Sequence, residues 1–178
     1  MTEVFLNRRH LSPVAAEERD EAVSGLYREH WAGMVRLALL MLGDRPSAED
    51  VVQDAYAGLY RRWDRIVDHT KAVSYLRSSV LNGSRTVLRR RTAARRLVHS
   101  EPPVWSTESE AMLSEERREV LAALHTLPTR QREVLVLRFY LRLSDPEIAS
   151  TLGIREVSVR SAASRGLAAL ARKLEDNR

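Results

Sequence analysis

The chain has 178 residues, with 29 Lys or Arg against 24 Asp or Glu, and its formal net charge of +5 favours an anionic partner. It has no cysteine, which excludes disulfides, thiol catalysis and cysteine-based zinc sites. The longest apolar run, LALLMLG at 37–43, is too short for a bilayer span of roughly 20 residues, and the acids near the N-terminus argue against a signal peptide, so we expect a cytoplasmic protein without a membrane partner.

Helical periodicity dominates the chain and no alternating strand pattern appears, which predicts an all-α fold. A first helix is expected from about 22 to 42, a second from about 46 to 63, and a third from about 71 into the arginine-rich segment 85–96. The side chains expected on the inner faces of these helices are Leu26, Met34, Leu37, Ala38 and Met41, then Val52, Ala55, Tyr56 and Leu59, then Val73, Leu76, Val80, Gly83 and Val87.

The helical pattern breaks between 97 and 110, where prolines, serines and acids predict a flexible linker. Helices are expected again at about 111–126 and 129–141. The chain is therefore predicted to contain two helical domains, at 22–96 and 111–178, with an N-terminal extension at 1–21.

The segment LSDPEIASTLGIREVSVRSAASRG, at 143–166, predicts a helix-turn-helix. Ser144 and Glu147 have the spacing of a capping box, and Gly153 suits the left-handed turn between two helices. The second helix would enter the DNA major groove. Its expected buried side chains are Val159, Ala163, Leu167, Leu170 and Leu174, and its expected exposed ones are Arg160, Ser161, Ser164, Arg165 and Ala168. The alternative is a helical hairpin in an ordinary bundle, with its arginines merely solvated.

The run RTVLRRRTAARR, at 85–96, contains six arginines and no acid. Such a run is often a solvated face or a disordered arm, but the apolar residues between the arginines favour an ordered helix. A polar surface precedes it on the same helix and includes Lys71, Arg77 and Asn82. Basic tracks with amide donors grip single-stranded nucleic acid, so the first domain is a candidate for holding a strand.

The segment AEDVVQDAY, at 48–56, places Glu49, Asp50, Gln53 and Asp54 on adjacent turns of the second helix. Paired carboxylates occur in acid–base catalysis and metal binding, but no histidine lies at ligand spacing and no glycine-rich phosphate loop is present. A protein docking surface and a simple contribution to the helix dipole both remain open for these acids.

Three segments, in this order, resemble motifs of the small two-domain extracytoplasmic-function (ECF) sigma factors of bacteria. They are AEDVVQDAYAGLYRRW at 48–63, SYLRSSVLNGSRTVLRRR at 74–91, and the stretch from LPTRQREVLVLR to SRG at 127–166. The resemblance extends from about 24 to 174. It implies a non-enzymatic factor, without cofactor or metal, that binds core RNA polymerase, recognises the −35 and −10 promoter elements and promotes melting.

The resemblance also implies roles for particular side chains. Those facing the clamp of the largest polymerase subunit would be Asp50, Val52, Gln53 and Asp54. Those contacting the −10 element would be Lys71, Arg77, Asn82, Arg85, Arg89 and Arg90, with Asn82 and the loop 64–71 holding a flipped base. Those contacting the −35 element would be Arg155, Ser158, Arg160, Ser161, Ser164 and Arg165. A further expected partner is the flap of the second-largest subunit, and an anti-sigma factor is a candidate partner.

Two other functional classes compete with this interpretation. A helix-turn-helix repressor or activator would act as a dimer on two half-sites, but it leaves the acidic helix and Asn82 unexplained. A helical enzyme or RNA-binding protein is the second class, and the chain shows no nucleophile–base pair or metal-ligand set for the enzyme.

Overall fold

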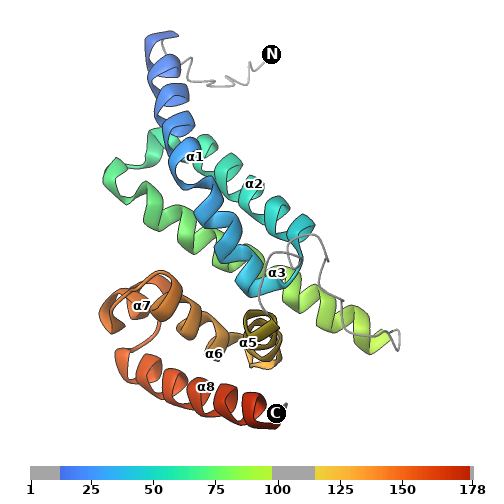
Figure 1. Cartoon of the computed structure of the whole chain (residues 1–178). Helices are drawn as coiled ribbons and strands as arrows, with labels where there is room; N and C mark the ends of the chain where they lie inside the picture. Colours follow the sequence, from blue (N-terminus) through green and yellow to red (C-terminus); the bar gives the residue numbers. More distant parts are fainter. Residues whose placement is uncertain (1–12, 98–114, 177–178) are drawn as a thin grey trace, which may run out of the picture.

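The computed structural model of the chain describes residues 13–97 and 115–176, which form helices and no strand. This confirms the predicted all-α fold. Two groups of helices follow one another along the chain, and we call them the first unit and the second unit (Figure 1). The first unit consists of α1 (Pro13–Leu42), α2 (Arg45–Arg62), the short 3-10 turns η1 (Trp63–Arg65) and η2 (His69–Lys71), and α3 (Ala72–Leu97). The second unit consists of α5 (Glu115–Thr126), α6 (Thr129–Leu135), the π-helical turn η3 (Val136–Tyr140), α7 (Asp145–Leu152) and α8 (Glu156–Asp176).

Two predicted segments lie largely or partly outside the described residues. The predicted linker at 97–110 lies outside the described residues except for Leu97. The helix predicted at 111–126 is described only from Glu115.

Helix α1 begins at Pro13, earlier than the predicted start near Ala22. The additional turns are rich in alanine and glutamate, which favour a helix but form no apolar stripe. They are tied to α2 because the Tyr60 hydroxyl donates to Asp20 Oδ1 at 2.8 Å and accepts from Arg19 Nη2 at 2.8 Å. The part of the predicted N-terminal extension from Pro13 onward is therefore part of α1.

Helices α2 and α3 complete the first unit and pack closely against each other. Asp44 caps α2, since its Oδ1 accepts from the Ser47 N–H at 3.0 Å. At Gly83 of α3, an added Cβ would lie 2.8 Å from Val51 Cγ1, so only glycine permits this approach. Several predicted inner side chains have no exposed surface: Leu37, Ala38, Met41, Val52, Leu59, Leu76 and Val80.

The helix-turn-helix is present in the second unit as α7 and α8. The Ser144 N–H and hydroxyl donate to Glu147 Oε2 at 2.8 Å and 2.6 Å, and a capping box starts α7 as predicted. Gly153 ends α7 with φ 64° and ψ 41°, the left-handed conformation that favours glycine.

The orientation of α8 differs in one respect from the prediction. Leu167, predicted to be buried, is 43% exposed, whereas Ala162 and Gly166 are buried. An added Cβ at Gly166 would lie 3.1 Å from Leu135 Cδ1, so α8 turns its smallest side chains toward α6. Close helix packing, rather than the size of the apolar side chains, sets the buried face here.

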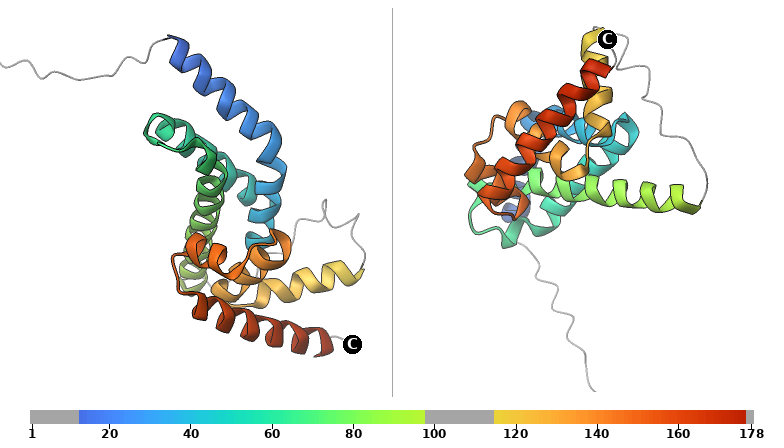
Figure 2. Two further views of the ribbon diagram at one scale, coloured as in Figure 1. Left: turned by 90° about the vertical axis from the view of Figure 1, so that its left-hand side faces the viewer. Right: turned by 90° about the horizontal axis from the view of Figure 1, so that it is seen from below.

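A single apolar core extends through both units. Helix α1 contacts α5, α6 and η3, and α3 contacts α7. Figure 2 shows the second unit lying across the lower part of the α1–α3 bundle. Within residues 13–97 and 115–176, none of the helices has the length and apolar character needed to span a bilayer.

Candidate DNA-binding and protein-binding surfaces

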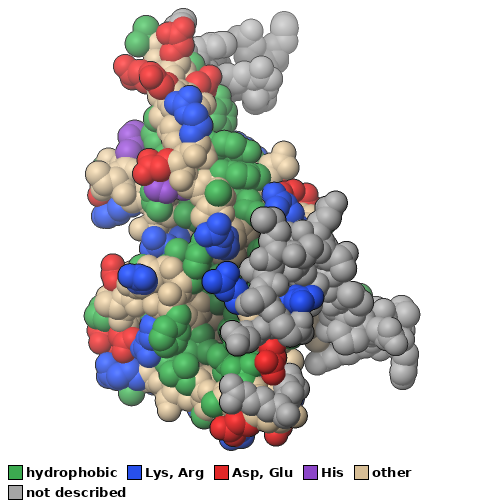
Figure 3. All heavy atoms as spheres, in the orientation of Figure 1, with side chains coloured by type: hydrophobic (Ala, Val, Ile, Leu, Met, Phe, Trp, Pro, Cys, Tyr) green, Lys and Arg blue, Asp and Glu red, His purple; other side chains and the backbone are tan. Residues whose placement is uncertain are grey.

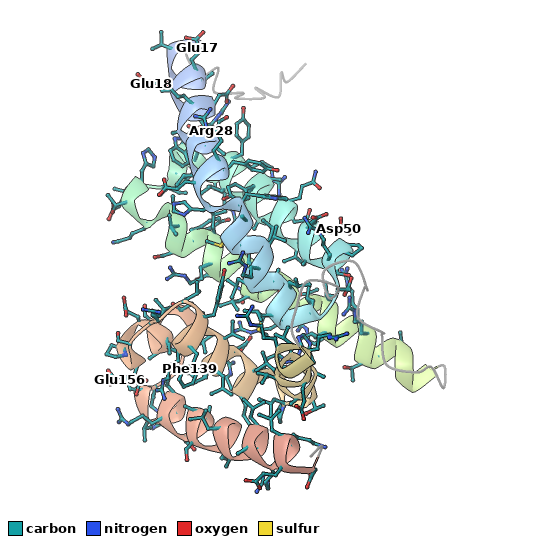
Figure 4. The ribbon with its side chains drawn as sticks, viewed as in Figure 1. Glu17, Glu18, Arg28, Asp50, Phe139 and Glu156 are labelled. Atoms are coloured by element: carbon teal, nitrogen blue, oxygen red, sulfur yellow. The ribbon has the colours of Figure 1, made fainter. Side chains whose placement is uncertain are left out.

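The acidic surface of α2 is formed by Asp50, Gln53 and Asp54, all of which are exposed. Glu49 differs from them because its carboxylate accepts from Arg45 Nε at 2.7 Å. Val52, predicted to contact the polymerase clamp, is fully buried in the core, so its side chain does not lie on this surface. Figure 4 places Asp50 at the opposite side of the molecule from Glu156, which begins α8.

The predicted strand-binding face of α3 lies partly against the second unit. Asn82 is exposed, and its Oδ1 accepts from Arg85 Nη1 at 2.7 Å. Arg89 and Arg90 are also exposed, whereas Arg77 and Arg85 are half-buried. Lys71, at the end of η2, is 77% exposed and pairs with Asp68 at 3.3 Å. Figure 3 shows basic side chains along the middle of the molecule, where the two units meet.

The loop between α2 and α3 is folded by its own contacts. Asp68 Oδ1 accepts from the Thr70 hydroxyl and from the Thr70 N–H, and these bonds, the hydroxyl foremost, lower the pKa of Asp68. The His69 ring stacks on Trp63, with ring centroids 4.2 Å apart. Val67, which immediately precedes Asp68, is fully exposed. The loop thus presents an apolar side chain to solvent on a preformed backbone.

The exposed face of α8 contains the residues predicted for duplex recognition. Arg155, which immediately precedes α8, and Arg160, Ser161, Ser164 and Arg165 are exposed, and Ser158 is half-buried. Arg160 Nη1 lies 3.6 Å from Glu156 Oε2, and both side chains are largely exposed. Such a surface ion pair is weak, so Arg160 can leave Glu156 and bind another anionic group.

A buried charged cluster was not predicted from the sequence. Arg132 is 6% exposed and Glu133 is 1% exposed. Arg132 donates to the carbonyl oxygens of His125, Leu127 and Met41. Burial lowers the pKa of Arg132 to about 10 and that of His125 to about 3. Arg132 therefore stays charged at neutral pH and His125 stays neutral. Charged residues are normally exposed, so the sequence alone gave no signal for this cluster.

An apolar groove of about 460 Å³, lined by residues of the second unit and by Leu40 of α1, was also not predicted. Phe139, labelled in Figure 4, is 60% exposed on its wall, and Leu167 is 43% exposed. The remaining lining residues are Leu40, Val120, Leu121, Leu124, Leu135, Val136, Tyr140 and Leu170. Exposed apolar surface of this kind is typical of a protein-binding groove.

No group of three acidic or histidine side chains suited to a metal occurs within the described part of the chain.

Comparison with known proteins gives consistent matches. The family described as Sigma-70 region 2 matches residues 26–94, and the family described as Sigma-70, region 4 matches residues 112–170. The chain is 32% identical over 142 residues to the RNA polymerase sigma-E factor of Streptomyces avermitilis, covering 80% of this chain and 79% of that protein. It is 30% identical over 151 residues to the ECF RNA polymerase sigma factor SigL of Mycobacterium tuberculosis, covering 83% of this chain and 85% of that protein.

Solved structures show a similar arrangement of helices. CnrH, determined in complex with the cytosolic domain of CnrY, gives a TM-score of 0.66 at 25% identity, covering 92% of this chain and 98% of that chain. The sigma factor RpoE of Bartonella quintana, determined in complex with the anti-sigma factor NepR, gives a TM-score of 0.62 at 19% identity, covering 91% of this chain and 97% of that chain. The second match is a likeness of fold alone.

Proposed function

Because the chain belongs to the ECF RNA polymerase sigma factors, transcription initiation factors that bind core RNA polymerase and promoter DNA, we propose a division of labour among its surfaces. The observation that carries the proposal is that the acidic face of α2, the basic face of α3 and the polar face of α8 lie on three separate helices. Each surface then has its own partner: the polymerase, the −10 strand and the −35 duplex. The dimeric repressor alternative is not favoured, because both sigma-70 regions match.

The polymerase contacts are proposed to be of two kinds. Asp50, Gln53 and Asp54 face the clamp of the largest subunit, where exposed carboxylates suit basic side chains. The apolar groove beside Phe139 receives an apolar element of the flap of the second-largest subunit. The protein contributes binding energy to initiation and is not an enzyme. We propose that it acts in the cytoplasm, with the polymerase.

The −10 element is proposed to bind along α3 and the preceding loop. Asn82 offers an amide that hydrogen-bonds a base edge, and the loop from 64 to 71, with exposed Val67, covers a flipped base. Lys71, Arg89 and Arg90 follow the phosphates. Capture of the base offsets the few kcal/mol that unstacking costs.

Substitution of Asn82 tests this assignment. Asn82→Ala is expected to lower the equilibrium fraction of open complex about tenfold, because one base-specific hydrogen-bonding group is lost. Fluorescence of 2-aminopurine in the −10 region would report melting, and co-elution would report polymerase binding, which should be unchanged. Ser74→Ala, an exposed position on the same helix, is the control. Equal loss of melting and polymerase binding in Asn82→Ala would contradict the assignment.

The −35 element is proposed to bind the exposed face of α8. Arg160→Ala is expected to weaken binding of the holoenzyme to promoter duplex by about 1–3 kcal/mol if the guanidinium reads a base, and to relax preference at one base pair. Fluorescence anisotropy on duplexes varied at single positions would measure both. Arg172→Ala, exposed near the end of the same helix, should change neither. An Arg160→Ala protein with unaltered sequence preference would show that another face of α8 reads the DNA.

An anti-sigma factor is a further proposed partner. The structures of CnrH and of Bartonella quintana RpoE were determined with CnrY and with the anti-sigma factor NepR, respectively. Their likeness to this chain supports a protein regulator of the same general kind.

A further inference from the structure

Arg19, in the first turns of α1, lies where α1, the end of α2 and the loop at 64–71 meet. Its Cζ lies 4.3 Å from the centroid of the Tyr60 ring of α2, and its Nη1 lies 3.9 Å from Asp64 Oδ2 in η1. We propose that Arg19 is a positioning residue, which holds the loop in the shape that selects the captured base of the −10 strand. This inference rests on the base-capture role proposed for that loop.

The contacts of Arg19 form one connected set, which fixes the position of its guanidinium. Nη2 donates to the Tyr60 hydroxyl at 2.8 Å, and that hydroxyl donates to Asp20 Oδ1 at 2.8 Å. Asp20 Oδ1 also lies 3.5 Å from Arg19 Nε. The Arg19 side chain is only 15% exposed, and a cation over an aromatic face is attracted more strongly when water is excluded. The guanidinium is therefore held against α2, with Nη1 directed to Asp64.

Asp64 lies at the start of the loop, where a small shift affects the rest of it. The Ile66 N–H donates to the Trp63 carbonyl oxygen at 3.0 Å and closes η1 around Asp64. Trp63 is buried, and its ring stacks on that of His69. Val67 lies in the sequence between the two stacked residues and is fully exposed. A displacement of η1 would therefore move the side chain that is proposed to cover the captured base.

The other attachments of the loop lead to α3 rather than to α1. Ala72, the first residue of α3, is fully buried directly after the loop. Arg62 Nη1, at the end of α2, donates to the Tyr75 hydroxyl of α3 at 3.3 Å. These contacts hold the end of the loop near the helix that carries Asn82. Arg19 adds a link from α1 to the start of the loop, so its loss is expected to loosen the start and leave the end in place.

The link to α1 comes from turns that the family match does not include. Arg19 and Asp20 precede residues 26–94, which match Sigma-70 region 2. A binding site discriminates between similar ligands only when the groups that contact them are held in place by the groups behind them. The first turns of α1 therefore support base selection from behind the loop, without touching the DNA themselves.

The first test measures the order of the loop in the chain alone. Arg19→Ala is expected to speed hydrogen exchange at the Ile66 N–H about tenfold, because local opening of η1 becomes easier. The N–H of Leu81, in the buried middle of α3, should change little. Arg28→Ala, which removes an exposed arginine of α1, is the matched control and should alter neither rate. Unchanged exchange at Ile66 in Arg19→Ala, or equal acceleration at Ile66 and Leu81, overturns the proposal whether or not the chain serves polymerase.

The second test measures base selection by the holoenzyme. The probe is a fluorescent single-stranded DNA carrying the non-template −10 region of a promoter that the holoenzyme transcribes. The four bases are placed in turn at the position where the unmodified holoenzyme discriminates most. Arg19→Ala is expected to reduce the ratio of affinities for the best and worst base about fivefold, with polymerase binding unchanged. Loss of folded protein alone would lower the active fraction and leave this ratio as it was.

The two tests separate failure of this inference from failure of the proposed function. If exchange at Ile66 rises but the affinity ratio does not fall, Arg19 does not act on base choice, and the sigma function stands. If the unmodified holoenzyme prefers no base at any position of the probe, the base-capture role of the loop is itself wrong.

A second variant covers the case in which Arg19→Ala does not fold. Tyr60→Phe keeps the ring beneath the guanidinium and removes only the hydroxyl that joins Arg19 to Asp20. It is expected to change exchange at Ile66 and the affinity ratio in the same directions as Arg19→Ala, by smaller factors. No change in a folded Tyr60→Phe protein, together with an unfolded Arg19→Ala protein, overturns the proposal.

Discussion

Reversing the two exposed carboxylates of α2, as Asp50→Lys with Asp54→Lys, is expected to weaken binding of core RNA polymerase by about 100-fold or more. Both side chains project into solvent, so the fold should tolerate the change. At the polymerase, each lysine would replace an attraction to a basic surface by a repulsion, and like charges across an interface cost several kcal/mol. Titration of labelled core polymerase at low and moderate salt would measure the loss, which should shrink as salt screens the charges.

The matched control for this double variant makes the same change in net charge on α8 instead of α2. Glu175→Lys with Asp176→Lys alters two exposed acids at the end of α8. This protein should bind core polymerase like the unmodified chain. Similar affinities for the two double variants would contradict the clamp assignment, since only the position of the charges differs between them.

The second large effect concerns stability. Arg132→Ala is expected to lower the free energy of unfolding by about 3 kcal/mol, because it leaves three carbonyl oxygens in a buried site without their charged donor. Urea denaturation followed by circular dichroism would measure it. Arg132→Lys should recover only part of the loss, since an ammonium group does not reproduce the planar fork that reaches all three acceptors.

Arg172→Ala serves as the comparison for that experiment. Arg172 is exposed on α8, and its removal should change the free energy of unfolding by less than about 0.5 kcal/mol. If the two alanine variants unfold at the same urea concentration, Arg132 does not organise the core of the second unit.

Much of the fold could be predicted because it depends on local signals. The capping box at Ser144 and Glu147 and the left-handed turn at Gly153 act within a few residues of one another, and both are present. The buried stripes of α2 and α3 follow from helical spacing alone. Asp50, Gln53 and Asp54 of α2 could also be placed on one exposed surface, whereas Val52, assigned to the same surface, belongs to the core.

The features that could not be predicted depend on how the helices meet. Leu167 is exposed because the small residues Ala162 and Gly166 let α8 approach α6 on another face. Arg132 and Glu133 are buried because α1 and α3 lie against α6 and supply a carbonyl oxygen and an arginine. The spacing of apolar residues within one helix does not show which other helix packs against it, since the contacting residues lie far apart in the sequence.

The most direct measurement mixes the purified chain with bacterial core RNA polymerase and resolves the mixture by size-exclusion chromatography. The sigma-factor function predicts stoichiometric co-elution with the polymerase and no stable dimer of the chain alone. Elution of the chain as a dimer, separate from the polymerase and able to shift promoter duplex unaided, would contradict it and favour a helix-turn-helix repressor.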